Sequence, residues 1–184
     1  MVRVGILVGS LRRESFSKKI AANVAELFPN GFETAFVEIG NLPLYNQDFD
    51  DDHDVPAEMT AFRSTMKEID AVLFVTPEYN RSIPAVLKNA LDVGSRPYGS
   101  SVWDEKPAAI ISQSPGNISG FGANHHLRQP LVFLNMPVLQ QPEAYLANSA
   151  ELLNENGEIT NEGTIQFLQT FVDAFVDLIK RYQA

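Results

Sequence analysis

Short apolar runs alternate along this chain with segments whose apolar residues recur at helical spacing. We expect strands at Val2–Val8, Glu33–Ile39, Ala71–Thr76 and Ala108–Ser112, and a short fifth strand at Pro137–Leu139. Because helical segments separate the strands, the alternation predicts a doubly wound parallel sheet with helices on both faces. A chain of 184 residues is near the usual length of one domain, so we expect a single α/β domain over residues 1–184.

The helical segments follow the strands in order. We expect helices at Ser17–Phe28, at Met59–Ile69, from Pro84 to Leu91 and at Ala123–Leu134, where Pro130 predicts a kink or a late start. The last segment carries an apolar stripe of Leu168, Val172, Phe175, Ile179 and Tyr182. In such sheets, ligands bind beyond the carboxyl ends of the strands. The candidate site therefore comprises a first loop (Gly9–Ser17), a second loop (Pro77–Ile83) and a third loop (Gln113–Gly122).

Charge and composition narrow the possible partners. The chain carries 23 acidic and 14 basic side chains, for a net charge of −9. Such a surface repels phosphate backbones and anionic membranes, so we expect no nucleic-acid partner. The absence of cysteine excludes thiolate nucleophiles and cysteine metal sites. No apolar stretch reaches the length of a membrane span or of a signal peptide's apolar region, so we expect a cytoplasmic protein without a membrane partner.

The first loop suits an anion. A loop between a strand and a helix directs backbone N–H groups and the positive end of the helix dipole at one point. Its serines add hydroxyl donors, and Arg12 supplies a charged fork for phosphate oxygens. The loop matches neither a nucleoside triphosphatase motif nor a dinucleotide fingerprint, because no lysine precedes Lys18 and Gly9 is its only glycine. It predicts a phosphomonoester site; a serine-capped helix with exposed arginines is the alternative.

The second loop suits a planar ring. It combines the aromatic side chain of Tyr79, the amide of Asn80 and free backbone N–H groups. A flavin ring needs an apolar or aromatic flank, with donors near N5 and the pyrimidine edge. The alternative is an ordinary turn with one half-buried tyrosine. Glu78 is either a proton relay or a carboxylate that orients Arg81.

These motifs together resemble the NADPH-dependent FMN reductase family, whose relatives reduce azo compounds, quinones and chromate. The resemblance rests on Gly9–Arg12 with Ser15–Ser17, on Pro77–Asn80, on Leu87–Asp92 and on Leu42–Asp48, in consistent order from Val2 to about Leu139. It implies a flavodoxin-like, five-stranded parallel sheet of order 2-1-3-4-5. It also implies FMN as the cofactor, NADPH or NADH as the reductant, and hydride transfer to N5 of FMN and then to a small-molecule acceptor.

The resemblance assigns roles to residues of all three loops. The FMN phosphate would be held by Ser10, Arg12, Ser15, Phe16 and Ser17. The isoalloxazine ring would be lined by Pro77, Glu78, Tyr79, Asn80 and Ser82, with further contact from Ser114 and Gly116. No side chain receives a catalytic role, because the cofactor carries the chemistry.

Two positions depart from the family pattern. Ser17 stands where many relatives have asparagine, although a hydroxyl can still donate to phosphate. In the third loop, where the family usually has a Gly-Gly pair, Ser119 and Phe121 are interspersed among glycines, so the choice between NADPH and NADH stays open.

No metal site is expected. The acidic run Asp48–Asp54 lacks the glycine and the closing glutamate of a calcium loop, so we interpret it as a solvated loop. His125 and His126 are adjacent, and adjacent helical residues diverge by about 100°. They are therefore expected at a surface or an interface rather than in one site.

Two alternatives to an enzyme remain at this point: an electron carrier of flavodoxin type, and a flavin-free binding domain. We also expect a homodimer or homotetramer, because Leu42, Leu44 and Tyr45 place apolar side chains in a turn-rich loop beside Phe49. In the resembling family this loop and the helix after Pro84 meet a partner subunit, which suggests Tyr45 and Val93 as contacts. The alternative is that the apolar side chains of Leu42–Tyr45 fold back onto the domain's own core.

Overall fold

The computed structural model describes residues 1–183. The elements, in chain order, are β1 (Val2–Val8), α1 (Phe16–Ala25), β2 (Phe32–Phe36), α2 (Asp48–Asp51), α3 (Ala57–Lys67), β3 (Ala71–Thr76), α4 (Ala85–Gly94), β4 (Ala108–Gln113), α5 (Phe121–Phe133), β5 (Ala144–Leu146), α6 (Ser149–Leu152) and α7 (Glu162–Gln183). The strands form one parallel sheet in the order β2-β1-β3-β4-β5, which confirms the predicted fold class.

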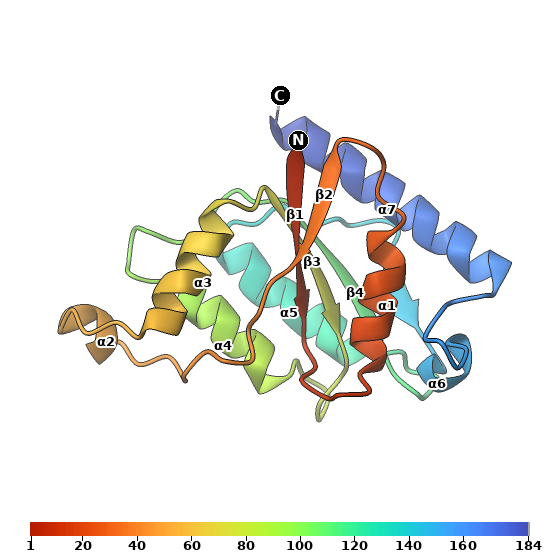
Figure 1. The fold of residues 1–184 in the computed structure, drawn as a ribbon, viewed down its shortest axis with the longest axis horizontal. Coiled ribbons are helices and arrows are strands. Elements are labelled where there is room, and N and C mark those ends of the chain that lie inside the picture. The colour runs from red at the N-terminus through yellow and green to blue at the C-terminus, as the bar shows by residue number, and fades with distance from the viewer. Residues whose placement is uncertain (184) are drawn as a thin grey trace.

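Helices cover both faces of the sheet. Figure 1 shows α1 and α7 on one side and α3, α4 and α5 on the other, and each set packs its apolar residues against the strands. All six residues of β3 are buried, as expected for a central strand with both faces covered. No helix within residues 1–183 is long and apolar enough to cross a membrane.

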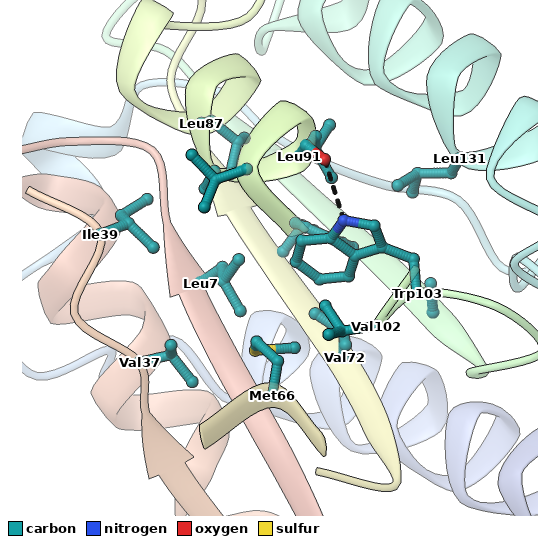
Figure 2. Packing of buried hydrophobic residues seen from close by; sticks show 14 of the residues in the cluster. Leu7, Val37, Ile39, Met66, Val72, Leu87, Leu91, Val102, Trp103 and Leu131 are labelled. Atoms are coloured by element: carbon teal, nitrogen blue, oxygen red, sulfur yellow. Dashed lines mark hydrogen bonds between the residues drawn. The ribbon is translucent and has the colours of Figure 1, made fainter. Parts of the chain in front are cut away.

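A single tryptophan anchors α4 to the sheet. Trp103 is fully buried, and its indole N–H donates to the carbonyl of Leu91 at 2.9 Å (Figure 2). Its ring centroid lies 6.0 Å from that of Phe62 and 6.3 Å from that of Phe74. Gly94 ends α4 directly against the indole, where a Cβ would stand 2.6 Å from the ring. This packing holds the helix that begins just after the second loop.

The register of the central strands brings the three loops together. Val8 pairs with Val75, and Thr76 pairs with Ser112, so β1, β3 and β4 end almost level. The first loop follows β1, the second follows β3 and the third begins at the end of β4. All three therefore emerge at one edge of the sheet, as the sequence predicts.

The fifth strand lies further along the chain than predicted. Segment 137–139 forms only an isolated bridge, in which Val138 faces Ala108. Pro142 then interrupts the pairing, since proline has no N–H to donate to a sheet ladder. Pairing resumes at β5, where Ala144 lies opposite Ile111. The prediction was wrong because two short extended segments run beside β4, and the sequence pattern marks only the first.

Two helices also differ from expectation. Helix α5 begins at Phe121 and continues through Pro130, so the late start was wrong. The proline leaves the carbonyl of His126 without its usual helical partner, and His126 is exposed, which limits the cost. In α7 the first four residues of the predicted stripe are buried, whereas Tyr182 is exposed in the last turn.

Candidate functional site

The first loop is held close to the sheet by its glycine and by a helix cap. A Cβ on Gly9 would lie 2.8 Å from Thr76 Oγ1, so the backbone approaches β3 as closely as only glycine allows. Ser15 caps α1, and its hydroxyl oxygen accepts from the backbone N–H of Lys18 at 3.1 Å. The loop thus leads directly into the positive end of a helix.

Arg12 and Arg13 in this loop and Lys18 in the first turn of α1 face solvent. The guanidinium of Arg12 lies 5.9 Å from the ring centroid of Phe16, within the range of a cation–π contact. Arg12 and Lys18 are exposed, and Ser10 and Phe16 are half-buried. Within residues 1–183, neither Arg12 nor Lys18 has a carboxylate at ion-pair distance. These groups can approach an anion without first breaking an internal ion pair.

The other two predicted phosphate ligands face inward. Ser17 is fully buried, and its Oγ accepts from Gln113 Nε2 at 2.8 Å. Ser15 is buried as well. Gln113 is a residue that sequence reasoning missed, although a glutamine ending an apolar strand run is unusual enough to mark it. Its Oε1 is buried without a hydrogen-bond partner among the described residues. This contact joins the start of α1 to the third loop.

The second loop is a two-residue hairpin. Tyr79 and Ser82 exchange both backbone hydrogen bonds at 2.9 Å. The residues between them, Asn80 and Arg81, both have positive φ, 50° and 66°, which is the backbone of a type I′ turn. Tyr79 and Asn80 are exposed at its tip, and Pro77 is half-buried at its base. The hairpin offers an aromatic side chain and an amide to a ligand above the strand ends.

Two hydrogen bonds tie this hairpin to α5. The carboxylate of Glu78 accepts from the Ala123 backbone N–H at 3.1 Å and from Arg81 Nη1 at 2.7 Å. The structure thus shows the contact with Arg81 that was one of the two alternatives for Glu78. Ser82 Oγ lies 2.6 Å from His126 Nδ1. His126 was not predicted to have this role. The second loop is therefore fixed to the helix that follows the third loop.

The third loop turns on residues in the left-handed region. Ser119 and Gly120 have φ of 60° and 71°, and a Cβ on Gly120 would lie 3.1 Å from the carbonyl oxygen of Gln113. Ser114 Oγ accepts from the Gly116 N–H at 3.0 Å, which places both predicted ring contacts in one tight turn. They lie beside Gln113, so all three loops meet at this end of the sheet.

The structure corrects two expectations about neighbouring residues. Val93 is fully buried in the core, so it cannot be a subunit contact. Within the acidic run, Asp50 is not solvated: its carboxylate accepts from both terminal nitrogens of Arg63, at 2.7 and 2.9 Å. The Arg63 hydrogen bonds hold the pKa of Asp50 below its usual value. Tyr45 Oη also donates to Asp50, at 3.2 Å. The loop thus folds back onto its own domain, although Leu44 stays exposed.

The two histidines diverge as predicted. Whereas His126 contacts the second loop, His125 Nε2 lies 3.0 Å from the hydroxyl of Tyr145. Among residues 1–183, no group of three or more histidine, aspartate or glutamate side chains could hold a metal ion. The site therefore provides cations and a helix N-terminus at one end, and an anchored hairpin with an aromatic side chain at the other. That donor set fits a flavin bearing a terminal phosphate.

Known proteins resemble this chain over almost its full length. It is 53% identical over 181 residues to a quinone reductase of Pseudomonas putida, covering 98% of this chain and 96% of that protein. It is 45% identical over 179 residues to a 2-hydroxy-1,4-benzoquinone reductase of a Burkholderia species, covering 97% of each. The structure superposes with a TM-score of 0.92 on the flavoenzyme NAD(P)H:(acceptor) oxidoreductase of Paracoccus denitrificans, at 40% identity and 99% coverage of each chain.

A flavodoxin of Pseudomonas aeruginosa superposes with a TM-score of only 0.57 at 20% identity, covering 95% of this chain and 99% of that one. That likeness shows a shared fold alone. Residues 2–151, which include all three loops, match the description of an NADPH-dependent FMN reductase. The chain belongs to the NADPH-dependent FMN reductase family and is an oxidoreductase that uses FMN and NAD(P)H.

Proposed function

We propose that this protein reduces quinones with NAD(P)H through FMN bound across the three loops. One observation carries the proposal. The adjacent strands β1 and β3 end at the same level, so the exposed cations of the first loop and the anchored hairpin of the second loop emerge at the same edge of the sheet. Relatives named as quinone reductases match the chain nearly end to end, which supports the choice of acceptor. Flavin, azo compounds and metal oxyanions are the other acceptor classes.

The chain's own residues bind and orient the reactants. When bound, FMN supplies the hydride chemistry between the nicotinamide and the acceptor. Arg12 and the N-terminus of α1 would hold the phosphate, because a charge-assisted hydrogen bond and a helix dipole both favour an anion there. The hairpin would present Tyr79 and its backbone to the ring. Glu78 and Ser82 would keep that hairpin in place through their bonds to α5.

The protein is expected to release FMN on denaturation, because the first loop suits a terminal phosphate and lacks a dinucleotide fingerprint. Chromatography of the released cofactor identifies it. NADPH added anaerobically to the holoprotein is expected to bleach the flavin absorption, and a benzoquinone is expected to restore it over many turnovers. Released FAD, or failure of the apoprotein to take up any flavin, contradicts the proposal. Reduction without multiple turnover would support the electron-carrier alternative, which family membership does not favour.

We also propose that a second copy of the chain covers a groove beside the second loop. This groove, of about 880 Å³, is lined by Tyr79 of the hairpin and by residues of α4 and α5, with Phe133 86% exposed at its edge. Lys88 and Asp92 line it as an ion pair at 2.7 Å, so together they present no net charge to a copy of the same surface. The groove is continuous with the ring site, so the neighbouring copy would help exclude water from it.

The Phe133→Lys variant is expected to be monomeric and to lose most of its quinone reduction, whereas the wild type is a dimer or tetramer. Light scattering gives the oligomeric state, and activity is followed during dilution. Ile165→Lys on α7, on the opposite face of the sheet, is the control and should change neither the oligomeric state nor the quinone reduction. A wild-type monomer with full NADPH oxidation at nanomolar concentration would rule out the shared site.

A further inference from the structure

A second pocket lies beside the first loop, on the side away from the second loop. It has a volume of about 490 Å³ and is formed between the first loop and the segment that follows β2. Its walls include Arg12, Lys18, Glu38 and Asn41, together with Leu11 and Phe36. The proposed FMN site already uses Ser10 and Arg12 from this wall, whereas Lys18, Glu38 and Asn41 have no role in it.

The pocket combines positive charge with apolar surface. Arg12 and Lys18 are exposed, and among residues 1–183 neither is paired with a carboxylate, in a chain whose net charge is −9. Leu11 and Phe36 are 61% and 49% exposed, and Leu11 packs against Gly40, where a Cβ would stand 2.7 Å from its Cδ2. An aromatic base that carries a phosphate nearby has both features.

Glu38 adds an oriented carboxylate at the end of β2. Its Oε1 accepts from the Gly40 backbone N–H at 2.6 Å, which fixes the side chain at the pocket wall. In Rossmann dinucleotide-binding domains, whose strand order and glycine fingerprint this chain does not share, an acidic residue hydrogen-bonds the adenosine ribose and a nearby arginine accommodates a 2′-phosphate. Here Glu38 and Lys18 line the same pocket, so the pocket offers groups for both the ribose and its phosphate.

We propose that this pocket binds the adenosine 2′-phosphate end of NADPH, an inference that rests on the proposed NAD(P)H-dependent function. Strands β2 and β3 are separated only by β1, so the pocket and the hairpin leave the sheet about 10 Å apart. An extended dinucleotide spans that gap, with its nicotinamide at the second loop and its adenosine beside the first. Lys18 then favours NADPH over NADH, whereas Glu38 favours the ribose hydroxyl of NADH.

The decisive variants change charge at the pocket and leave the hairpin intact. Lys18→Met should lower kcat/KM for NADPH about fivefold, the scale of an exposed ion pair, and change that for NADH less than twofold. Glu38→Gln should have the opposite effect and raise the ratio of kcat/KM for NADPH to kcat/KM for NADH. Lys67→Met, an exposed lysine of α3, is the matched control and should leave the ratio unchanged.

Binding of 2′,5′-ADP to the FMN-loaded protein, measured by calorimetry, tests the pocket without turnover. The wild type should bind it, and Lys18→Met should bind it about fivefold more weakly. The proposal would be overturned if Lys18→Met changed kcat/KM equally for NADPH and NADH, or if it left the 2′,5′-ADP affinity unchanged. Loss of FMN affinity with an unchanged nucleotide ratio would overturn it too, by assigning Lys18 to the FMN phosphate. If the wild type binds 2′,5′-ADP but oxidises neither nucleotide, the proposed function fails while the pocket assignment stands.

Discussion

Replacing Arg63 with methionine is expected to lower the free energy of unfolding by about 3 kcal/mol, because it leaves Asp50 without its charged partner. The two side chains are 11% and 8% exposed and make two hydrogen bonds. The estimate lies at the low end for buried pairs, since Asp50 borders a small pocket. Arg63 Nε also donates to the Val93 carbonyl at 3.0 Å, so the variant removes a contact between α3 and α4 as well.

Urea titration of the apoprotein measures this change. Lys19→Met is the control, because Lys19 forms an exposed pair with Glu14 and its loss should cost less than about 1 kcal/mol. The hydrogen bonds from Arg63 lower the pKa of Asp50 from its usual 3.8. The pair therefore stabilises the fold fully above that value and loses its effect as pH falls through the lower folded-state pKa. The stability difference between wild type and R63M should shrink below about pH 4; a constant difference would mean that Arg63 acts through packing alone.

Arg12→Ala is expected to weaken FMN binding by about 10- to 150-fold and to leave riboflavin binding nearly unchanged. The range follows from the roughly 1.5–3 kcal/mol of a charge-assisted hydrogen bond. Riboflavin lacks the phosphate and so reports any effect on the ring site. Quenching of flavin fluorescence on titration with apoprotein gives both affinities.

Arg13→Ala provides the matched comparison for Arg12→Ala, because Arg13 is exposed in the same loop and does not line the pocket beside it. It should change FMN affinity less than about threefold, the scale of a screened surface charge. Equal losses for FMN and riboflavin in the Arg12 variant would show that this arginine supports the fold or the ring site. Equal losses of FMN affinity in the two arginine variants would mean that the net charge of the loop, rather than a direct contact from Arg12, favours FMN binding.

The central strands of the sheet could be predicted from the local sequence pattern, because a continuous apolar run marks such a strand even when its neighbouring strands are unknown. Six consecutive buried residues mark β3, and the predicted and observed bounds agree. The same reasoning placed the fifth strand wrongly, because an edge strand exists only where its backbone can pair. Whether segment 137–139 or segment 144–146 pairs with the end of β4 depends on the position of Pro142 in three dimensions.

The sequence by itself determined which loops form the candidate site, since a parallel sheet places successive strand ends at one edge. It also identified Arg12 and Tyr79 as groups suited to a phosphate and a ring, and the structure shows that both are exposed. Only the tertiary structure decided how the remaining polar groups are used. Ser17 turns inward to Gln113, 96 residues away, and Glu78 bonds to the N-terminus of α5. Periodicity depends on neighbours along the chain, whereas the partner of a buried polar group is whichever donor or acceptor the packing brings near it.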